Sequence, residues 1–261
     1  MEAYGFSSRR RELELYLAAQ PDGWFVIVDG DELVAVGGAV AYGSFCWIGL
    51  VATDPARQRE GLATRLSSHL VEWAQTRGCT TIALDASQAG RPVYERLGFR
   101  VVGETAELSL PLRIPDPPPG VVLVGSGDIE QLLELDRRAF GGDRARLLRA
   151  LSRQEHSRCH VARRGGEPAG YLFARKRLLG PGCARTDEVA RHLVRAASAD
   201  RGATGDAAGR RLLVPIESRY LDVLGDLGLS VERRLAHMRL GDPVLPGKRD
   251  ELLAQTSFAA G

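Results

Sequence analysis

The chain has 261 residues, 44% hydrophobic and 26% charged, a composition typical of a soluble globular protein and unlike that of a long disordered chain. The net charge of +2, from 35 basic and 33 acidic residues, argues against nucleic acid as a partner. No apolar run approaches the roughly 20 residues that span a bilayer, and no secretory signal opens the chain, so we expect a cytoplasmic protein with no membrane partner.

The first part of the chain alternates strand and helix patterns. Two apolar runs flank the turn at Asp29–Asp31 and predict a hairpin. Apolar residues recur at helical spacing from Leu62 to Trp73, and Gly78 is a suitable helix stop. The expected elements are strands at 25–28, 33–36 and 45–52, a helix from 61 to 78, a strand at 81–84, a short helix at 91–97 and a strand from 99.

A proline-rich segment follows, with five prolines between Pro111 and Gly120. Proline stops helices and cannot donate to a sheet ladder, so this segment predicts a semi-rigid linker. We therefore expect one domain over residues 1–110, a linker over 111–120, a second domain over 121–241 and a C-terminal tail over 242–261.

The second part repeats the alternation. Its expected strands lie at 121–124, 159–162, 170–174, 212–216 and 231–240, and its expected helices at 129–140, 147–151, 186–197 and 220–227. Both parts close a helix on Leu-Gly and then enter a strand, at Leu97-Gly98 and at Leu227-Gly228. The matching order of elements favours an internal duplication.

The loop from Val51 to Thr64 carries the clearest chemical signal. A buried strand ends there, a polar loop turns, and a long amphipathic helix starts. A helix N-terminus presents unpaired N–H groups that bind phosphate when no side chain blocks the approach, and Gly61 and Ala63 would keep it open. From the spacing alone, an ordinary strand-to-helix turn remains the alternative.

At these residues the sequence resembles the GNAT superfamily of N-acetyltransferases. The acetyl-CoA signature of that family, Gln or Arg, two residues, Gly, one residue, and Gly or Ala, is matched by Gln58–Ala63. A second match follows at Val93–Phe99, and Leu84–Pro92 resembles a subgroup with two tandem domains. The resemblance implies an α+β fold of two tandem GNAT-like domains, each with a mixed, mostly antiparallel twisted sheet flanked by helices.

The resemblance also implies acetyl-CoA as cosubstrate. Backbone groups of the strand end would pair with pantetheine, and a strand N–H near Leu50 or Val51 would polarise the thioester carbonyl. Ser87 lies near a family asparagine that steadies CoA. The implied cofactor-binding residues are Leu50, Val51, Ala52, Thr53, Gln58, Arg59, Glu60, Gly61, Leu62, Ala63, Thr64 and Ser87.

Two residues are candidates for proton transfer. Tyr94 matches the family tyrosine that protonates the departing thiolate; the alternative is a half-buried aromatic that anchors its helix. Many family members use a glutamate on the central strand as general base, but residues 45–50 hold no carboxylate. Asp85, at the end of the next strand, is the nearest candidate, with a cap or turn role as the alternative.

The chain departs from the family pattern in two places. Its second half lacks the signature loop, so we expect a degenerate domain that binds no acetyl-CoA; Asp136, Asp143 and Arg144 would line the acceptor site or form caps and ion pairs. The first half is short before Gly23 and lacks the usual first strand and helix. An uncovered edge strand invites pairing, so a homodimer is one expected outcome.

These patterns predict an acetyl-CoA-dependent N-acyltransferase that moves an acetyl group directly to a primary amine of a small molecule. The alternative is a non-catalytic acyl-CoA-binding or interaction module with the same fold, which the missing strand glutamate favours. Four cysteines without a Cys-x-x-Cys motif and five histidines without ligand spacing predict no metal.

Overall fold

The computed structural model describes residues 10–111, 121–124, 126–200 and 210–261. The chain divides into two compact units, and neither unit is one continuous segment. Unit 1 consists of Met1–Gly103, Leu235–Leu245 and Phe258–Gly261, and unit 2 of Glu104–Arg234 and Pro246–Ser257.

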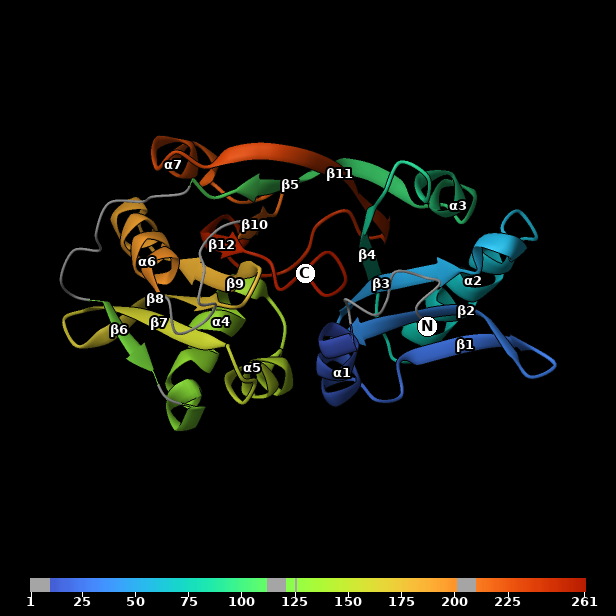
Figure 1. The fold of residues 1–261 in the computed structure, drawn as a ribbon, viewed down its shortest axis with the longest axis horizontal. Helices are drawn as coiled ribbons and strands as arrows, with labels where there is room; N and C mark the ends of the chain where they lie inside the picture. The colour runs from blue at the N-terminus through green and yellow to red at the C-terminus, as the bar shows by residue number, and fades with distance from the viewer. Residues whose placement is uncertain (1–9, 112–120, 125, 201–209) are drawn as a thin grey trace. The chain divides into compact units, whose positions relative to one another are not determined.

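The sheet of unit 1 has the strand order β1-β2-β3-β4-β11, and helix α2 packs on β2 and β3 (Figure 1). The hairpin, the central strand and the long helix predicted from the sequence are confirmed. The elements are α1 (Arg10–Ala19), β1 (Trp24–Asp29), β2 (Glu32–Ala41), β3 (Phe45–Thr53), the 3-10 helix η3 (Pro55–Arg57), α2 (Leu62–Thr76), β4 (Thr81–Ala86), α3 (Arg91–Arg96) and the second half of β11 (Ser230–Gly241).

Helix α2 forms because its apolar residues repeat every three or four positions and share one face. Leu66, Leu70 and Trp73 are all buried and join one core cluster with side chains of β3 and β4. Fully burying one leucine contributes roughly 1.5–3 kcal/mol, so this stripe fixes which face of α2 meets the sheet. Its polar face and its N-terminal end stay accessible.

Unit 2 repeats the plan with the strand order β5-β10-β9-β8-β7-β6, and β12 pairs with β9. Helix α6 packs on β7, β8 and β9 (Figure 1). The elements are β5 (Arg100–Ser109), β6 (Val121–Val124), η4 (Ser126–Leu132), α4 (Leu133–Phe140), α5 (Ala145–Ser152), β7 (Arg158–Arg164), β8 (Glu167–Ala174), β9 (Leu178–Ala184), α6 (Asp187–Ala199), β10 (Arg211–Val214), α7 (Leu221–Asp226), η5 (Arg249–Glu251) and β12 (Leu252–Ala254).

The two units share a strand–helix–strand core and exchange their last strands. In unit 1, β3 and β4 pair in parallel around α2; in unit 2, β9 and β10 pair in parallel around α6. The end of β5 pairs antiparallel with β10, and the end of β11 pairs antiparallel with β4. Helices α3 and α7 both end on a leucine followed by a left-handed glycine, Gly98 (φ 87°) and Gly228 (φ 85°).

This exchange cuts across the contiguous division expected from the sequence. Residues 104–110 belong to unit 2 and 235–245 to unit 1. The expected tail, 242–261, contains η5, strand β12 and eight residues of unit 1, 242–245 and 258–261. Sequence periodicity locates a strand but does not identify the sheet that it joins, which is why the exchange was missed. The proline-rich residues 112–120 lie outside the described part of the chain.

Candidate functional site

A bulge in β3 interrupts its pairing with β2 in the middle of the unit 1 sheet. Val36 and Gly38 of β2 pair with Ala52 and Gly49 of β3, so the single residue between them opposes two residues of β3. One of those two, Leu50, has φ 53°. A non-glycine residue in the left-handed region costs energy and is typical of functional sites, where a bulge re-aims the strand.

Beyond the bulge, β3 and β4 diverge. Their parallel ladder runs only from Phe45–Thr81 to Trp47–Ala83, although β3 continues to Thr53 and β4 to Ala86. The outer edges of both strands are occupied, by β2 and by β11. The strand edge at 48–53 that faces β4 can therefore accept an extended ligand as an added strand. This edge contains the four predicted strand residues, Leu50 to Thr53.

The loop after β3 leads to a helix end without a side-chain cap. Asp54 Oδ1 accepts a hydrogen bond from Ala56 N–H at 2.8 Å and starts η3. Gly61, the N-cap of α2, has φ 80°, and no side chain caps the first turn. A Cβ at Gly61 would have no heavy atom within 4 Å. The first N–H groups of α2 thus face open space with the positive end of the helix dipole behind them.

Ion pairs hold this loop in place. The Arg57 guanidinium bonds Glu60 at 2.8 Å and Asp29, in the β1–β2 turn, at 2.9 Å. Glu60 therefore directs its carboxylate to Arg57, so only its backbone remains for a cofactor. Gln58 and Arg59 are exposed, and Arg59 has φ 71°. Two left-handed residues, Arg59 and Gly61, turn the chain sharply into α2.

Tyr94 and Ser87 lie at the short helix α3. The Tyr94 ring packs on the ring of Phe99, with centroids 5.7 Å apart. Burial raises the pKa of the Tyr94 hydroxyl to about 12, and the neighbouring Ser67 side chain of α2 opposes that rise. Tyr94 thus lies against α2, the helix that begins directly after the predicted cofactor loop. The Ser87 hydroxyl accepts a hydrogen bond from Gly90 N–H at 3.1 Å, in the turn before α3.

Asp85 lies on the other face of β4, in a row of polar side chains that sequence reasoning missed. Neighbouring Leu84 and Ala86 point into the core beneath α2, so the alternation of side chains directs Asp85 the opposite way. Asp85 Oδ1 lies 2.9 Å from Nδ1 of His237, and Arg239 Nε–H donates to His237 Nε2 at 3.0 Å. All three side chains are buried. Because 152 residues separate Asp85 from His237, no local pattern could have indicated the pair.

Residues 258–261 cover the same face of β3. Trp47 Nε1–H donates to the Phe258 carbonyl at 3.2 Å, and the Tyr42 hydroxyl donates to the Ala260 carbonyl at 2.8 Å. A Cβ at Gly49 would lie 2.3 Å from Cα of Ala259, so the strand needs glycine there for the close approach. This segment walls the side of the opening that faces away from α2.

The corresponding helix of unit 2 has a different N-terminus. The Thr186 hydroxyl accepts a hydrogen bond from Val189 N–H and caps α6, and Asp187 and Glu188 occupy its first turn. A capped helix end with two carboxylates repels phosphate, in contrast to the end of α2. This geometry agrees with the missing signature loop in the second half.

The acidic residues expected near the acceptor site in unit 2 form ion pairs and caps instead. Arg144 bonds Asp136 at 2.8 Å, and the two side chains are 0% and 2% exposed. The Tyr171 hydroxyl also bonds Asp136. Asp143 accepts a hydrogen bond from Ala145 N–H at the start of α5. Of the two alternatives left open by the sequence, the structure shows the ion pair and the cap.

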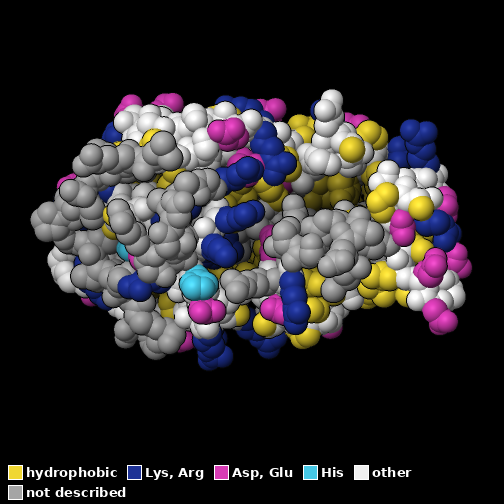
Figure 2. Space-filling view, viewed as in Figure 1, with side chains coloured by type: hydrophobic (Ala, Val, Ile, Leu, Met, Phe, Trp, Pro, Cys, Tyr) yellow, Lys and Arg dark blue, Asp and Glu magenta, His cyan; other side chains and the backbone are white. Residues whose placement is uncertain are grey.

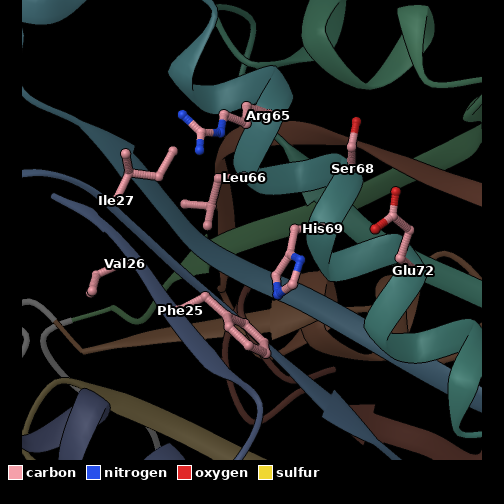
Figure 3. Close-up of a pocket in the computed structure, with 8 residues that line it drawn as sticks. All are labelled: Phe25, Val26, Ile27, Arg65, Leu66, Ser68, His69 and Glu72. Atoms are coloured by element: carbon pink, nitrogen blue, oxygen red, sulfur yellow. The ribbon is translucent and has the colours of Figure 1, made fainter. Parts of the chain in front are cut away.

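A groove of about 530 Å³ lies between β1 and the outer side of α2 (Figure 3). Its apolar floor includes Phe25, whose ring meets the His69 ring edge-on at 4.5 Å, and its rim carries Arg65 and Glu72. None of the predicted cofactor-binding or catalytic residues lines this groove. Sequence reasoning did not indicate it, because its residues belong to ordinary amphipathic patterns.

Within the described ranges, no group of three or more His, Cys, Asp or Glu side chains is arranged to hold a metal ion. Among the same residues, no helix is both long and apolar enough to cross a bilayer. Basic and acidic side chains both lie on the face shown in Figure 2, and several arginines are paired with carboxylates, as in Arg91–Glu95 and Arg149–Glu130.

Comparison with known proteins agrees with this geometry. Residues 1–99 match the acetyltransferase (GNAT) family, and residues 132–254 match an acetyltransferase (GNAT) domain. The chain is 30% identical over 228 residues to the uncharacterized N-acetyltransferase YitH of Bacillus subtilis, and this match covers 83% of the chain and 78% of YitH.

Solved structures show the same fold. A proposed acetyltransferase from Pyrococcus horikoshii superposes with a TM-score of 0.86 at 28% identity and covers 98% of this chain and 86% of its own. A tandem GNAT protein from the clavulanic acid biosynthesis pathway has a TM-score of 0.54 at 15% identity and covers 90% of this chain and 95% of its own. The chain belongs to the GNAT family and is an acetyltransferase with two GNAT domains.

Proposed function

We propose that unit 1 transfers an acetyl group from acetyl-CoA directly to a primary amine of a small molecule. The observation that carries this proposal is the opening between β3 and β4, which leads to the uncapped N-terminus of α2. An extended thioester arm requires such a strand edge, and a pyrophosphate requires such a helix end.

The cofactor arm follows the opening. Backbone groups of Leu50, Val51, Ala52 and Thr53 pair with pantetheine. The pyrophosphate accepts hydrogen bonds from N–H groups of the loop and of the first turn of α2, from Arg59 to Thr64. The Gln58 side chain is exposed, and Ser87 flanks the arm from the turn before α3. The N-terminus of α6, the corresponding helix of unit 2, is capped and acidic, so we expect one acetyl-CoA per chain.

In the proposed acyl transfer, Tyr94 and Asp85 donate and accept protons from opposite faces of β4. The amine nitrogen attacks the thioester carbonyl, whose developing oxyanion accepts a hydrogen bond from the N–H of Leu50 or Val51. The new C–N bond forms as the C–S bond breaks. The thiolate takes a proton from Tyr94, on the α2 face, and the amine loses a proton to Asp85, on the face covered by residues 258–261.

The acceptor site lies on that covered face, which limits what can enter. Trp47 and the small residues at 259–261 form a close-packed wall. On the face shown in Figure 2, basic and acidic side chains are interspersed, an arrangement that does not favour a basic protein tail. Both features favour a small amine over a protein lysine.

The experiment is a thiol-release assay with acetyl-CoA and a panel of small amines. We expect at least one amine to give turnover that Tyr94→Phe largely abolishes while the affinity for acetyl-CoA is kept. Tyr16→Phe is the matched control, since it removes the hydroxyl of a buried tyrosine of α1 that bonds Glu12. Binding of acetyl-CoA without turnover on any amine would instead support the non-catalytic acyl-CoA-binding module.

We also propose that β1 pairs with a second copy of the chain. It is the end strand of the unit 1 sheet among the described residues, and its Val26 and Val28 side chains are 57% and 61% exposed. Exposed apolar edge strands favour pairing between chains. Sedimentation should show a dimer that Val28→Lys dissociates; a monomer at every concentration would refute this proposal.

A further inference from the structure

The buried side chains of Asp85, His237 and Arg239 form a hydrogen-bonded row in unit 1, outside the cofactor loop. It joins β4 to β11, where His237 pairs directly with Asp85 in the antiparallel ladder. The His237 ring also lies beside the Trp47 ring, with centroids 5.2 Å apart. The row therefore stands next to the last residue of β3 that still pairs with β4.

The hydrogen bonds determine which ring nitrogen of a neutral His237 carries the proton. Arg239 has only N–H groups to offer, so Nε2 of His237 must be an acceptor. The proton of a neutral imidazole then sits on Nδ1 and is donated to Asp85, 2.9 Å away. Arg239 is held in place in turn, because its guanidinium also donates to the Pro243 carbonyl.

A histidine beside a carboxylate can act as the base itself or can orient the carboxylate, and this arrangement distinguishes the two roles. His237 cannot readily act as the base itself, because the guanidinium occupies its Nε2 lone pair and a second proton would face that positive charge. Asp85 accepts a hydrogen bond from His237, which fixes the direction of its carboxylate. The geometry thus favours Asp85 as the base and His237 as the residue that orients it.

We propose that His237, locked by Arg239, is a positioning residue that orients Asp85 to take the proton of the acceptor amine. The proposal rests on the proposed acyl transfer. In the proton step, the N–H bond of the attacking amine breaks and an O–H bond forms on Asp85. The Nδ1 proton of His237 remains in place throughout. The strand β11, which comes from the second half of the sequence, thereby completes the site of the first.

Two charged or titratable side chains of β11 lie beside Asp85: His237 in direct contact and Arg239 behind it. On the β3 side the neighbouring ring is Trp47, and Gly261, which carries the terminal carboxylate of the chain, packs against that ring.

The experiment compares His237→Ala with His237→Asn in the full-length chain. The pH profile of kcat/KM should rise to its plateau about 1–2 pH units higher in His237→Ala, the size expected when a carboxylate loses one charge-assisted hydrogen bond. His237→Asn offers an amide N–H near the place of Nδ1 and should restore most of the profile. KM for acetyl-CoA should stay unchanged in both variants.

His160→Ala is the matched control. His160 of unit 2 is also buried and lies 3.0 Å from a carboxylate, that of Asp200. Its loss should lower stability without moving the pH profile. An unmoved acid limb in His237→Ala, or equal profiles for the Ala and Asn variants, would overturn the proposal.

A second readout does not depend on turnover. The ¹⁵N signals of His237 should show a neutral ring protonated on Nδ1 across neutral pH. A ring protonated on Nε2, or a charged imidazolium, would refute the proposed lock even if no amine is turned over. Failure of every amine with the expected tautomer present would count against acyl transfer and not against the lock.

Discussion

The N-terminus of α2 should bind the pyrophosphate, and two glycines of that helix allow a matched test. Gly61 begins α2 with φ 80°, and Gly78 follows its end with φ 78°; a Cβ at either position meets no heavy atom within 4 Å. Replacement of either by glutamate carries the same backbone cost of about 1–2 kcal/mol. The two sites are separated by the 15 residues of α2, or about 22 Å.

Only the glutamate at position 61 should weaken the binding of acetyl-CoA. A carboxylate about 6 Å from each of two phosphate charges, at an effective dielectric constant of about 40, costs about 1.4 kcal/mol per charge. Together they raise the dissociation constant about 100-fold. Isothermal titration with acetyl-CoA measures this effect, and thermal melts check that Gly61→Glu and Gly78→Glu lose similar stability. Equal affinities in the two variants would refute the assigned phosphate site.

Three further predictions concern catalysis, domain structure and unit 2. Tyr94→Phe should lower kcat by about 10²–10⁴. Burial raises the pKa of Tyr94 to about 12, so the tyrosine keeps its proton as the pH rises. The kcat of the wild type should therefore show no fall from Tyr94 below about pH 11. A fragment of residues 1–110 lacks the β11 segment that pairs with β4, so it should aggregate or melt without cooperativity; a cooperative melt would contradict the strand exchange. Asp136→Ala leaves Arg144 buried without its carboxylate and should cost about 3–5 kcal/mol in unfolding free energy, against at most about 1 kcal/mol for Asp226→Ala at the exposed Arg191–Asp226 pair.

The parts of the site that lie close together in the sequence could be predicted from it. The apolar strand, the polar loop and the amphipathic helix from Phe45 to Trp73 depend on local periodicity and on Gly61. The family resemblance placed Tyr94 on its short helix for the same reason. These elements are present at the expected positions, within a few residues.

The parts of the site that depend on strand pairing could not be predicted. His237 reaches Asp85 only because β11 joins β4, and both strands read as ordinary strands in isolation. The bulge at Leu50 is likewise invisible, because leucine gives no local signal for a left-handed conformation. Residues 258–261 form a close wall against Gly49 through backbone contacts, which side-chain patterns do not encode.

Hydrogen–deuterium exchange with and without acetyl-CoA tests the central claim most directly, because it locates the cofactor along the chain. The account predicts slower exchange in residues 48–53 and 59–64 of unit 1, and no change at the start of α6 in unit 2. Protection confined to unit 2, or none in the loop before α2 at saturating acetyl-CoA, would contradict it.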